Sequence, residues 1–133
     1  MNYLLDTNIC IYFMKNTYPQ LSEQFLSYDP ARLFLSAITV FELEYGAAKS
    51  KWGERTRINL AMFLAPFTIL PFGANEAGIC GALRARLEQT RTPIGPYDLQ
   101  IAATALSHDL CLITHNINEF GRVPHLTTED WIQ

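Results

Sequence analysis

The chain has 133 residues, of which 49% are hydrophobic and 17% are charged. This composition excludes an intrinsically disordered chain, and the length is that of one domain with its own core, which we expect to span residues 1–133. The formal net charge of −3, from 10 basic and 13 acidic residues, excludes a uniformly basic protein that coats nucleic acid. It leaves open a nucleic-acid ligand, because basic residues can be segregated on one face.

The three cysteines, Cys10, Cys80 and Cys111, lie far apart among apolar neighbours. That spacing gives no disulfide framework and is typical of small buried thiols in a reducing compartment. No secretory signal is visible, because Asp6 interrupts the apolar start. The longest apolar stretch, residues 63–72, contains two prolines and is too short to span a bilayer. We therefore expect a cytoplasmic protein.

Short apolar runs alternate with longer segments in which apolar residues recur three and four positions apart, the patterns of strands and helices. In chain order they predict a strand at 3–5, helices at 9–14 and 21–28, a strand at 33–35, helices at 39–48 and 54–65, a strand at 67–70, a helix at 75–90, a loop at 92–96, a helix at 98–108, a strand at 111–114 and a turn at 115–120. This alternation predicts a parallel α/β sheet with helices on both faces. Helix aromatics such as Phe41 and Tyr45 fall mostly on stripes that we expect to face the core.

Four acidic residues follow or face the ends of the predicted strands. Asp6 ends the first strand, Glu42 lies on the helix after the second, Asp98 opens the helix before the last, and Glu119 follows the last strand. Because the carboxyl ends of parallel strands meet at one edge of a sheet, we expect these side chains to converge. Carboxylates about 4–5 Å apart repel by several kcal/mol, so such a cluster calls for protons or a divalent cation.

Each acid alone has an ordinary explanation as a helix cap, a solvated helix residue or a turn residue. Only the four acids taken together, with their placement at strand ends, favour a functional site. A cluster of carboxylates without His or Cys ligands suits a hard cation, Mg²⁺ first and Mn²⁺ as the alternative. Carboxylates, Mg²⁺ and a phosphate oxygen together form the chemistry of phosphodiester hydrolysis.

The four acids lie in the segments LLDTN (4–8), SAITVFELEYG (36–46), PIGPYDLQIAA (93–103) and LITHNINEF (112–120). In sequence and order these segments resemble the motifs of the PIN-domain ribonucleases, and within them the VapC toxins of type II toxin–antitoxin systems. The resemblance covers nearly the whole chain. It implies a PIN-like three-layer α/β/α fold with a central, mostly parallel sheet of four or five short strands.

The same resemblance implies a Mg²⁺-dependent endoribonuclease that is toxic, forms a homodimer and is restrained by a VapB-type antitoxin in a hetero-oligomer. The Pro-Ile-Gly-Pro stretch and the C-terminal Glu-Asp-Trp are similar to toxins that cut initiator tRNA in its anticodon stem-loop. In the fourth motif, where the family varies between acids and Asn, Asn116 and Asn118 leave Glu119 as the only acid.

We expect Asp6 and Asp98 to hold the metal ion, and Glu42 and Glu119 to complete its shell through water or a second ion. A water activated by the metal then attacks phosphorus, which leaves 5′-phosphate and 3′-hydroxyl ends. Nearby hydroxyl and amide side chains are expected either to orient the carboxylates and waters or to serve only in turns and caps: Thr7, Asn8, Thr114 and Asn116.

Basic residues concentrate in two groups, at positions 49–57 and 84–91. We predict that Arg84, Arg86 and Arg91 contact the RNA backbone, the alternative being that they lie on solvated helix faces. Among the aromatic residues of the early helices, some are expected to form a groove for the antitoxin or the dimer partner.

Other functions remain open at this point. One is a nuclease of the same fold that acts on ribosomal or messenger RNA, and another is a non-catalytic interaction domain. A phospho-receiver domain is disfavoured because no lysine follows Lys51. A haloacid-dehalogenase-like phosphatase is disfavoured because Asn8 stands where that chemistry needs a second aspartate two residues after the first.

Overall fold

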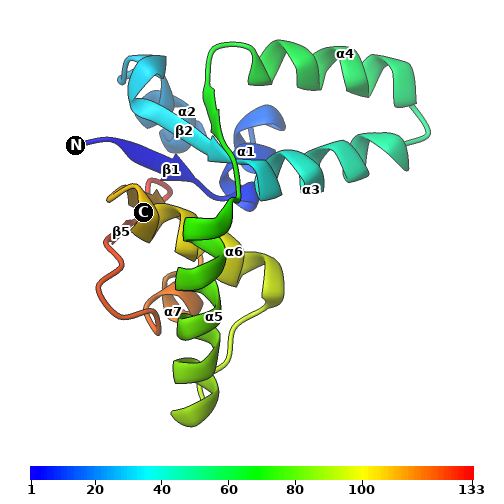
Figure 1. Ribbon diagram of the computed structural model, residues 1–133. Coiled ribbons are helices and arrows are strands. Elements are labelled where there is room, and N and C mark those ends of the chain that lie inside the picture. Colours follow the sequence, from blue (N-terminus) through cyan, green and yellow to red (C-terminus); the bar gives the residue numbers. More distant parts are fainter.

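The computed structural model describes all 133 residues, which build a central sheet of five parallel strands (Figure 1). The strands are β1 (Tyr3–Leu5), β2 (Leu33–Ser36), β3 (Thr68–Leu70), β4 (Cys111–Ile113) and β5 (Thr128–Glu129). Their order across the sheet is β3-β2-β1-β4-β5, and every neighbouring pair is parallel. The prediction of a parallel sheet of four or five short strands is confirmed.

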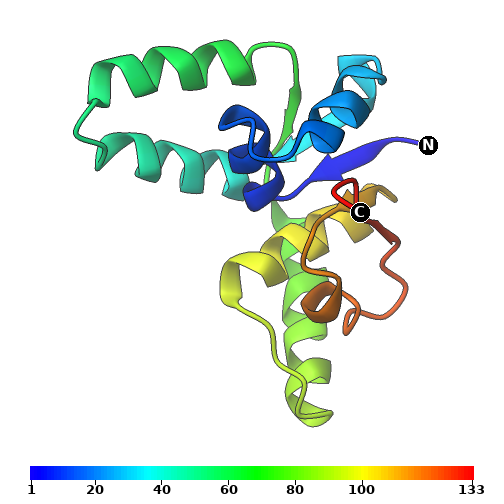
Figure 2. The same cartoon turned by 180° about the vertical axis from the view of Figure 1, so that it is seen from behind.

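Seven α-helices and one 3₁₀ turn connect the strands. They are α1 (Thr7–Met14), α2 (Pro19–Leu26), the 3₁₀ turn η1 (Pro30–Arg32), α3 (Ala37–Ala48), α4 (Gly53–Leu64), α5 (Ala74–Gln89), α6 (Pro96–Ser107) and α7 (Ile117–Phe120). Helices α1 to α4 lie on one side of the sheet, and α5 to α7 lie on the other (Figures 1 and 2). None of these helices combines the length and the apolar character that a membrane crossing needs.

Each face of the sheet has its own hydrophobic core, because side chains alternate between the two faces along a strand. Tyr3 and Leu5 of β1 pack with α1 to α4, whereas Leu4 packs with α5 and α6. In β4, Cys111 packs in the core with α1 to α4, and Leu112 packs in the core with α5 and α6. The two cores give the three layers that the sequence predicts. Cys10 and Cys111 are buried thiols, as expected, whereas Cys80 is only half-buried.

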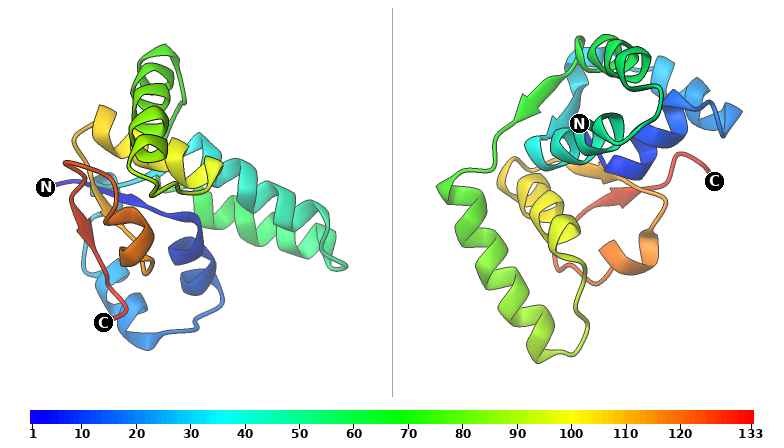
Figure 3. Two further views of the ribbon diagram at one scale, coloured as in Figure 1. Left: turned by 90° about the horizontal axis from the view of Figure 1, so that it is seen from below. Right: turned by 90° about the vertical axis from the view of Figure 1, so that its right-hand side faces the viewer.

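Helices α3 and α4 form a hairpin that extends away from the sheet (Figure 3). Helix α3 begins two residues before its predicted start, because the Ser36 side chain accepts a hydrogen bond from the Ile38 amide and caps it. Its buried residues are Thr39, Leu43 and Ala47, four positions apart.

The expectation that Phe41 and Tyr45 face the core is wrong, because they are 48% and 59% exposed. At 100° per residue, Phe41 lies about 200° around the helix from the buried Thr39, which turns it to the opposite side.

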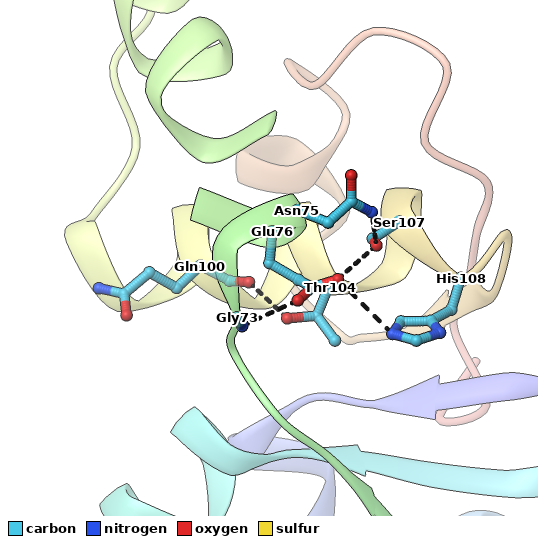
Figure 4. A network of polar contacts seen from close by, with 7 residues as sticks. All are labelled: Gly73, Asn75, Glu76, Gln100, Thr104, Ser107 and His108. Atoms are coloured by element: carbon cyan, nitrogen blue, oxygen red, sulfur yellow. Dashed lines mark hydrogen bonds and ion pairs between the residues drawn. The ribbon is translucent and has the colours of Figure 1, made fainter. Parts of the chain in front are cut away.

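A buried carboxylate ties the start of α5 to the end of α6 (Figure 4). Glu76 accepts hydrogen bonds from the Gly73 amide at 2.8 Å and from the Ser107 hydroxyl at 2.5 Å. His108 Nε2 lies 3.7 Å from the same carboxylate, and the Asn75 amide donates to Ser107 Oγ at 2.7 Å. This network fixes α6, the helix that carries Asp98, at its far end.

Candidate metal-dependent nuclease site

Asp6 is placed by the end of β1 and the start of α1. Its carboxylate caps α1 by accepting a hydrogen bond from the Ile9 amide at 2.8 Å. Its own amide donates to the Ile113 carbonyl of β4 at 3.1 Å, so the backbone of Asp6 is held against the neighbouring strand. The side chain is only 5% exposed, which makes it the most deeply buried of the four predicted acids.

Asp98 and Glu119 come together from α6 and α7 around Gly95. A methyl group on Gly95 would lie 3.9 Å from Asp98 Oδ2 and 3.8 Å from Glu119 Oε1, so both carboxylates border the same point of the backbone. The Gly95 amide donates to Glu119 Oε1 at 3.0 Å, and the Asn116 side-chain amide donates to Oε2 at 2.6 Å. The negative charge of Glu119 is, after burial, the largest influence that raises the pKa of Asp98, so the two carboxyl groups are close neighbours.

Glu42 reaches the same region from α3. The Thr7 hydroxyl donates to Glu42 Oε1 at 2.6 Å and is hydrogen-bonded to the Thr39 hydroxyl at 3.1 Å. Thr7 is the residue after Asp6, so this contact joins the start of α1 to α3. The structure therefore brings all four predicted acids to the carboxyl edge of the sheet.

The four carboxylates act on one another electrostatically. Burial raises the pKa of Asp6 to about 6, and the charges of Glu42 and Asp130 add to this, against hydrogen bonds from Thr114 and the Ile9 amide. Burial raises the pKa of Asp98 to about 7, helped by the charge of Glu119, the hydrogen bond with it, and the charges of Asp6 and Glu42. No Lys or Arg forms an ion pair with any of these four carboxylates.

Three of the four predicted supporting residues make contacts in the site. Thr7 donates a hydrogen bond to Glu42, Asn116 donates one to Glu119, and the Thr114 side chain lowers the pKa of Asp6. Asn8 is exposed and takes part in none of the side-chain hydrogen bonds of the site.

Sequence reasoning assigned no role to Asp130, although its charge reaches Asp6. Its side chain is 8% exposed, Oδ1 accepts a hydrogen bond from the Ile132 amide at 2.9 Å, and Oδ2 lies 2.8 Å from His115 Nδ1. Asp130 follows β5, so it lies at the same edge of the sheet as Asp6, which follows β1. Strand β5 has only two residues, which is too short to show the alternating pattern of a strand.

The donors at this edge suit a hard cation. No three carboxylate, imidazole or thiol groups are packed tightly enough to hold a metal ion by themselves. Mg²⁺, however, keeps several of its waters and binds through one or two carboxylates together with substrate phosphate. Asp6 and Asp98, whose pKa values are raised by burial and by their acidic neighbours, carry oxygen donors of the type that this ion prefers.

The predicted RNA-binding arginines lie on and after α5, and none of their side chains forms a hydrogen bond or an ion pair with the four acids. Arg84 forms an exposed ion pair with Glu88 at 3.1 Å. Arg86 and Arg91 are exposed, and Arg91 ends the helix with a φ of 58°. Their role in RNA binding stays a prediction.

Comparison with known proteins agrees with this geometry. The model of the PIN domain family matches residues 3–126. The tRNA(fMet)-specific endonuclease VapC of Salmonella typhimurium is 38% identical over 131 residues, 98% of each chain, and Ribonuclease VapC2 of Haemophilus influenzae is 39% identical over 132 residues, 99% of each chain. The chain belongs to the PIN-domain family and, within it, to the VapC ribonucleases.

Solved structures of VapC relatives confirm the PIN-like fold. The chain matches a structure of DNA-bound VapBC from Salmonella typhimurium with a TM-score of 0.92 and 38% identity over 98% of both chains. It matches VapBC-1 from nontypeable Haemophilus influenzae with a TM-score of 0.91 and 36% identity over the full length of both. PIN-domain ribonucleases are metal-dependent as a family, which agrees with the carboxylate site described above.

Proposed function

We propose that this VapC-family chain is a toxin that hydrolyses RNA phosphodiester bonds with Mg²⁺ held by Asp6 and Asp98. The observation that carries the proposal is the meeting of acids from α1, α3, α6 and α7, whose burial and mutual repulsion raise the pKa values of Asp6 and Asp98. A bound divalent cation relieves that repulsion. Mn²⁺ offers the same charge and is the alternative ion.

In this mechanism the bound ion supplies an activated water and neutralises charge at the phosphate. The chain's own residues position the reaction. Thr7 holds Glu42, and Asn116 with the Gly95 amide holds Glu119, so both carboxylates are oriented to bind waters at the phosphate. Because the nucleophile is water and not the ribose 2′-hydroxyl, the products carry 5′-phosphate and 3′-hydroxyl ends.

The substrate class follows from the relatives. The Salmonella relative is named as an endonuclease specific for tRNA(fMet), and its identity to this chain extends over 98% of both sequences. We therefore propose initiator tRNA, cut in its anticodon stem-loop, as the substrate. Cleavage of ribosomal or messenger RNA is the competing outcome.

The proposed regulator is a VapB-type antitoxin, because similar solved structures are VapBC complexes. An apolar cleft of about 750 Å³ lies between α1, α3 and α4 and suits an amphipathic helix. Its lining includes Ile11, Phe13, Met14, Leu43, Met62 and Phe63. Glu42 also borders the cleft, so a docked antitoxin reaches the acids. We further propose that residues 1–133 form a single domain and that the toxin forms a homodimer.

The test is incubation of the purified chain with initiator tRNA, other tRNAs and ribosomal RNA, with Mg²⁺ or with EDTA. We expect cleavage of initiator tRNA that needs the metal, and loss of cleavage in Asp6→Asn. Equal cleavage by the wild type and Asp6→Asn would contradict the site, and products with 2′,3′-cyclic phosphate would contradict the mechanism. Preferential cleavage of ribosomal RNA would contradict the substrate alone.

A further inference from the structure

One face of α3 carries aromatic rings in solvent. Phe41, Tyr45 and Lys49 follow one another at four-residue intervals, so they lie along one stripe of the helix and its C-cap. Tyr97, at the start of α6, extends the stripe across to the neighbouring helix. Phe41, Tyr45 and Tyr97 are 48%, 59% and 45% exposed, and Lys49 is exposed. We call these four residues the α3 stripe.

The α3 stripe begins at the acids. Phe41 precedes Glu42 in the chain and Tyr97 precedes Asp98, so the first two rings belong to residues that adjoin two of the four acids along the backbone. Their centroids are 5.4 Å apart at an interplanar angle of 68°, an edge-to-face contact that leaves ring faces without another aromatic ring against them. Farther along, Lys49 Nζ lies 4.8 Å from the centre of the Tyr45 ring.

We propose that the α3 stripe stacks unpaired bases of the substrate RNA next to the phosphate that is cut, an inference that rests on the proposed ribonuclease function. Bases in single-stranded loops stack on exposed aromatic side chains, and such stacking tolerates different sequences. The acids repel the RNA backbone, whereas the rings bear no charge and bind the bases. Lys49, at the end of the stripe farthest from the acids, suits a backbone phosphate.

The antitoxin cleft does not account for this stripe. The cleft uses Leu43, Gly46 and Ala47 of α3, and none of the four stripe residues lines it. A second copy of the chain is the other candidate occupant. The exposed Lys49 ammonium favours RNA, because at a backbone phosphate it meets an opposite charge and keeps contact with water.

The first measurement is cleavage kinetics of a tRNA anticodon stem-loop by Phe41→Leu and Tyr97→Leu. We expect KM to rise roughly tenfold or more in each, with a smaller effect on kcat, because a base loses its stacking surface. Phe41→Trp should retain a KM near that of the wild type. Leu26→Ala, which removes an exposed apolar side chain from α2, is the matched control and should change neither constant.

The second measurement does not depend on cleavage. The Asp98→Asn protein is titrated into the same stem-loop with 2-aminopurine in the loop, with and without Phe41→Leu. We expect quenching of 2-aminopurine fluorescence that Phe41→Leu removes. Unchanged quenching together with an unchanged KM would overturn the proposal that the α3 stripe stacks RNA bases. Sedimentation velocity in which Phe41→Leu dissociates a dimer formed by the wild type would also overturn it, because the stripe would then be a dimer interface. Absence of cleavage by the wild type would contradict the proposed function, and the quenching would still decide on the stripe.

Discussion

Carboxylates at the two ends of α6 lie in opposite environments, because Glu76 of α5 is buried against the C-terminal end and Asp98 is half-buried at the N-terminal end. At the C-terminal end, Glu76 accepts hydrogen bonds from Ser107 and Gly73, and these lower its pKa, with a smaller effect from His108. At the N-terminal end, Asp98 lies against Glu119, and burial with that neighbour raises its pKa to about 7. The fold stabilises the charged form of Glu76 and destabilises the charged form of Asp98.

This difference separates a structural carboxylate from a functional one. A buried charge whose hydrogen bonds are complete contributes to the packing of α5 against α6. A group of charges that the chain leaves without a counter-charge costs folding free energy, and it is retained where a ligand or cofactor supplies the missing charge. The comparison therefore predicts that substitutions at the two ends of α6 have opposite effects on activity and stability.

The largest expected effect is on catalysis. Asp98→Asn should lower the rate of RNA cleavage on the order of 100-fold or more, because it removes a charge that binds the cation. Glu76→Gln, on α5 against the opposite end of α6, should retain cleavage under conditions where the variant is folded. Single-turnover cleavage with Mg²⁺ measures both, and equal losses in the two variants would contradict the distinction.

The second largest expected effect is on the free energy of unfolding in the absence of metal. A pKa raised from 3.8 to about 6 corresponds to about 3 kcal/mol that favours the protonated form of Asp6. Asp6→Asn keeps a capping oxygen for Ile9 and removes the charge, so it should raise the free energy of unfolding at pH 8 by up to that amount. Glu76→Gln should lower the urea midpoint instead. A less stable Asp6→Asn would contradict the proposed cost of burying the charged Asp6 carboxylate beside other acids.

The third effect is on pH dependence. The folded-state pKa values of Asp6 and Asp98 lie above 3.8, so the folded chain binds more protons than the unfolded chain between about pH 4 and pH 7. Their contribution to stability is therefore lost as pH rises through that window. Glu76 acts in the opposite direction, since its lowered pKa gives stability that is lost as pH falls below about 4.5.

Bound metal should remove the loss of stability that Asp6 and Asp98 cause as pH rises. Saturating Mg²⁺ stabilises the charged carboxylates and should raise the melting temperature more at pH 8 than at pH 5. The double variant Asp6→Asn with Asp98→Asn is the control, in which Mg²⁺ should change the melting temperature little. A wild-type melting temperature that does not respond to Mg²⁺ or Mn²⁺ at pH 8 would contradict metal binding at this site.

The smallest effect concerns the orientation of Glu42. Thr7→Val removes the hydroxyl that donates to Glu42 at 2.6 Å and keeps the shape of the side chain. Cleavage should fall by about tenfold, the usual cost of losing a group that orients a ligand. Thr7→Ser retains the hydroxyl and should retain most of the activity. Equal activity of the two variants would show that the hydrogen bond has no catalytic role.

The sequence by itself determined much of the fold and the positions of the four acids. The strands at 3–5, 33–35 and 111–114 could be predicted because each is a short apolar run bounded by polar or turn residues. The parallel order followed from the alternation of strands and helices. Asp6, Glu42 and Asp98 stood out because a parallel sheet brings strand ends and helix starts to one edge.

Only the tertiary structure decided what depends on contacts between distant residues. It paired Thr128 with Leu112 to form β5, a strand too short to have a pattern of its own, and so placed Asp130 beside Asp6. It also turned Phe41 and Tyr45 to solvent, because packing of Leu43 selected the buried side of α3. Periodicity predicts that a helix has a buried face, but which residues are buried depends on the neighbour that covers them.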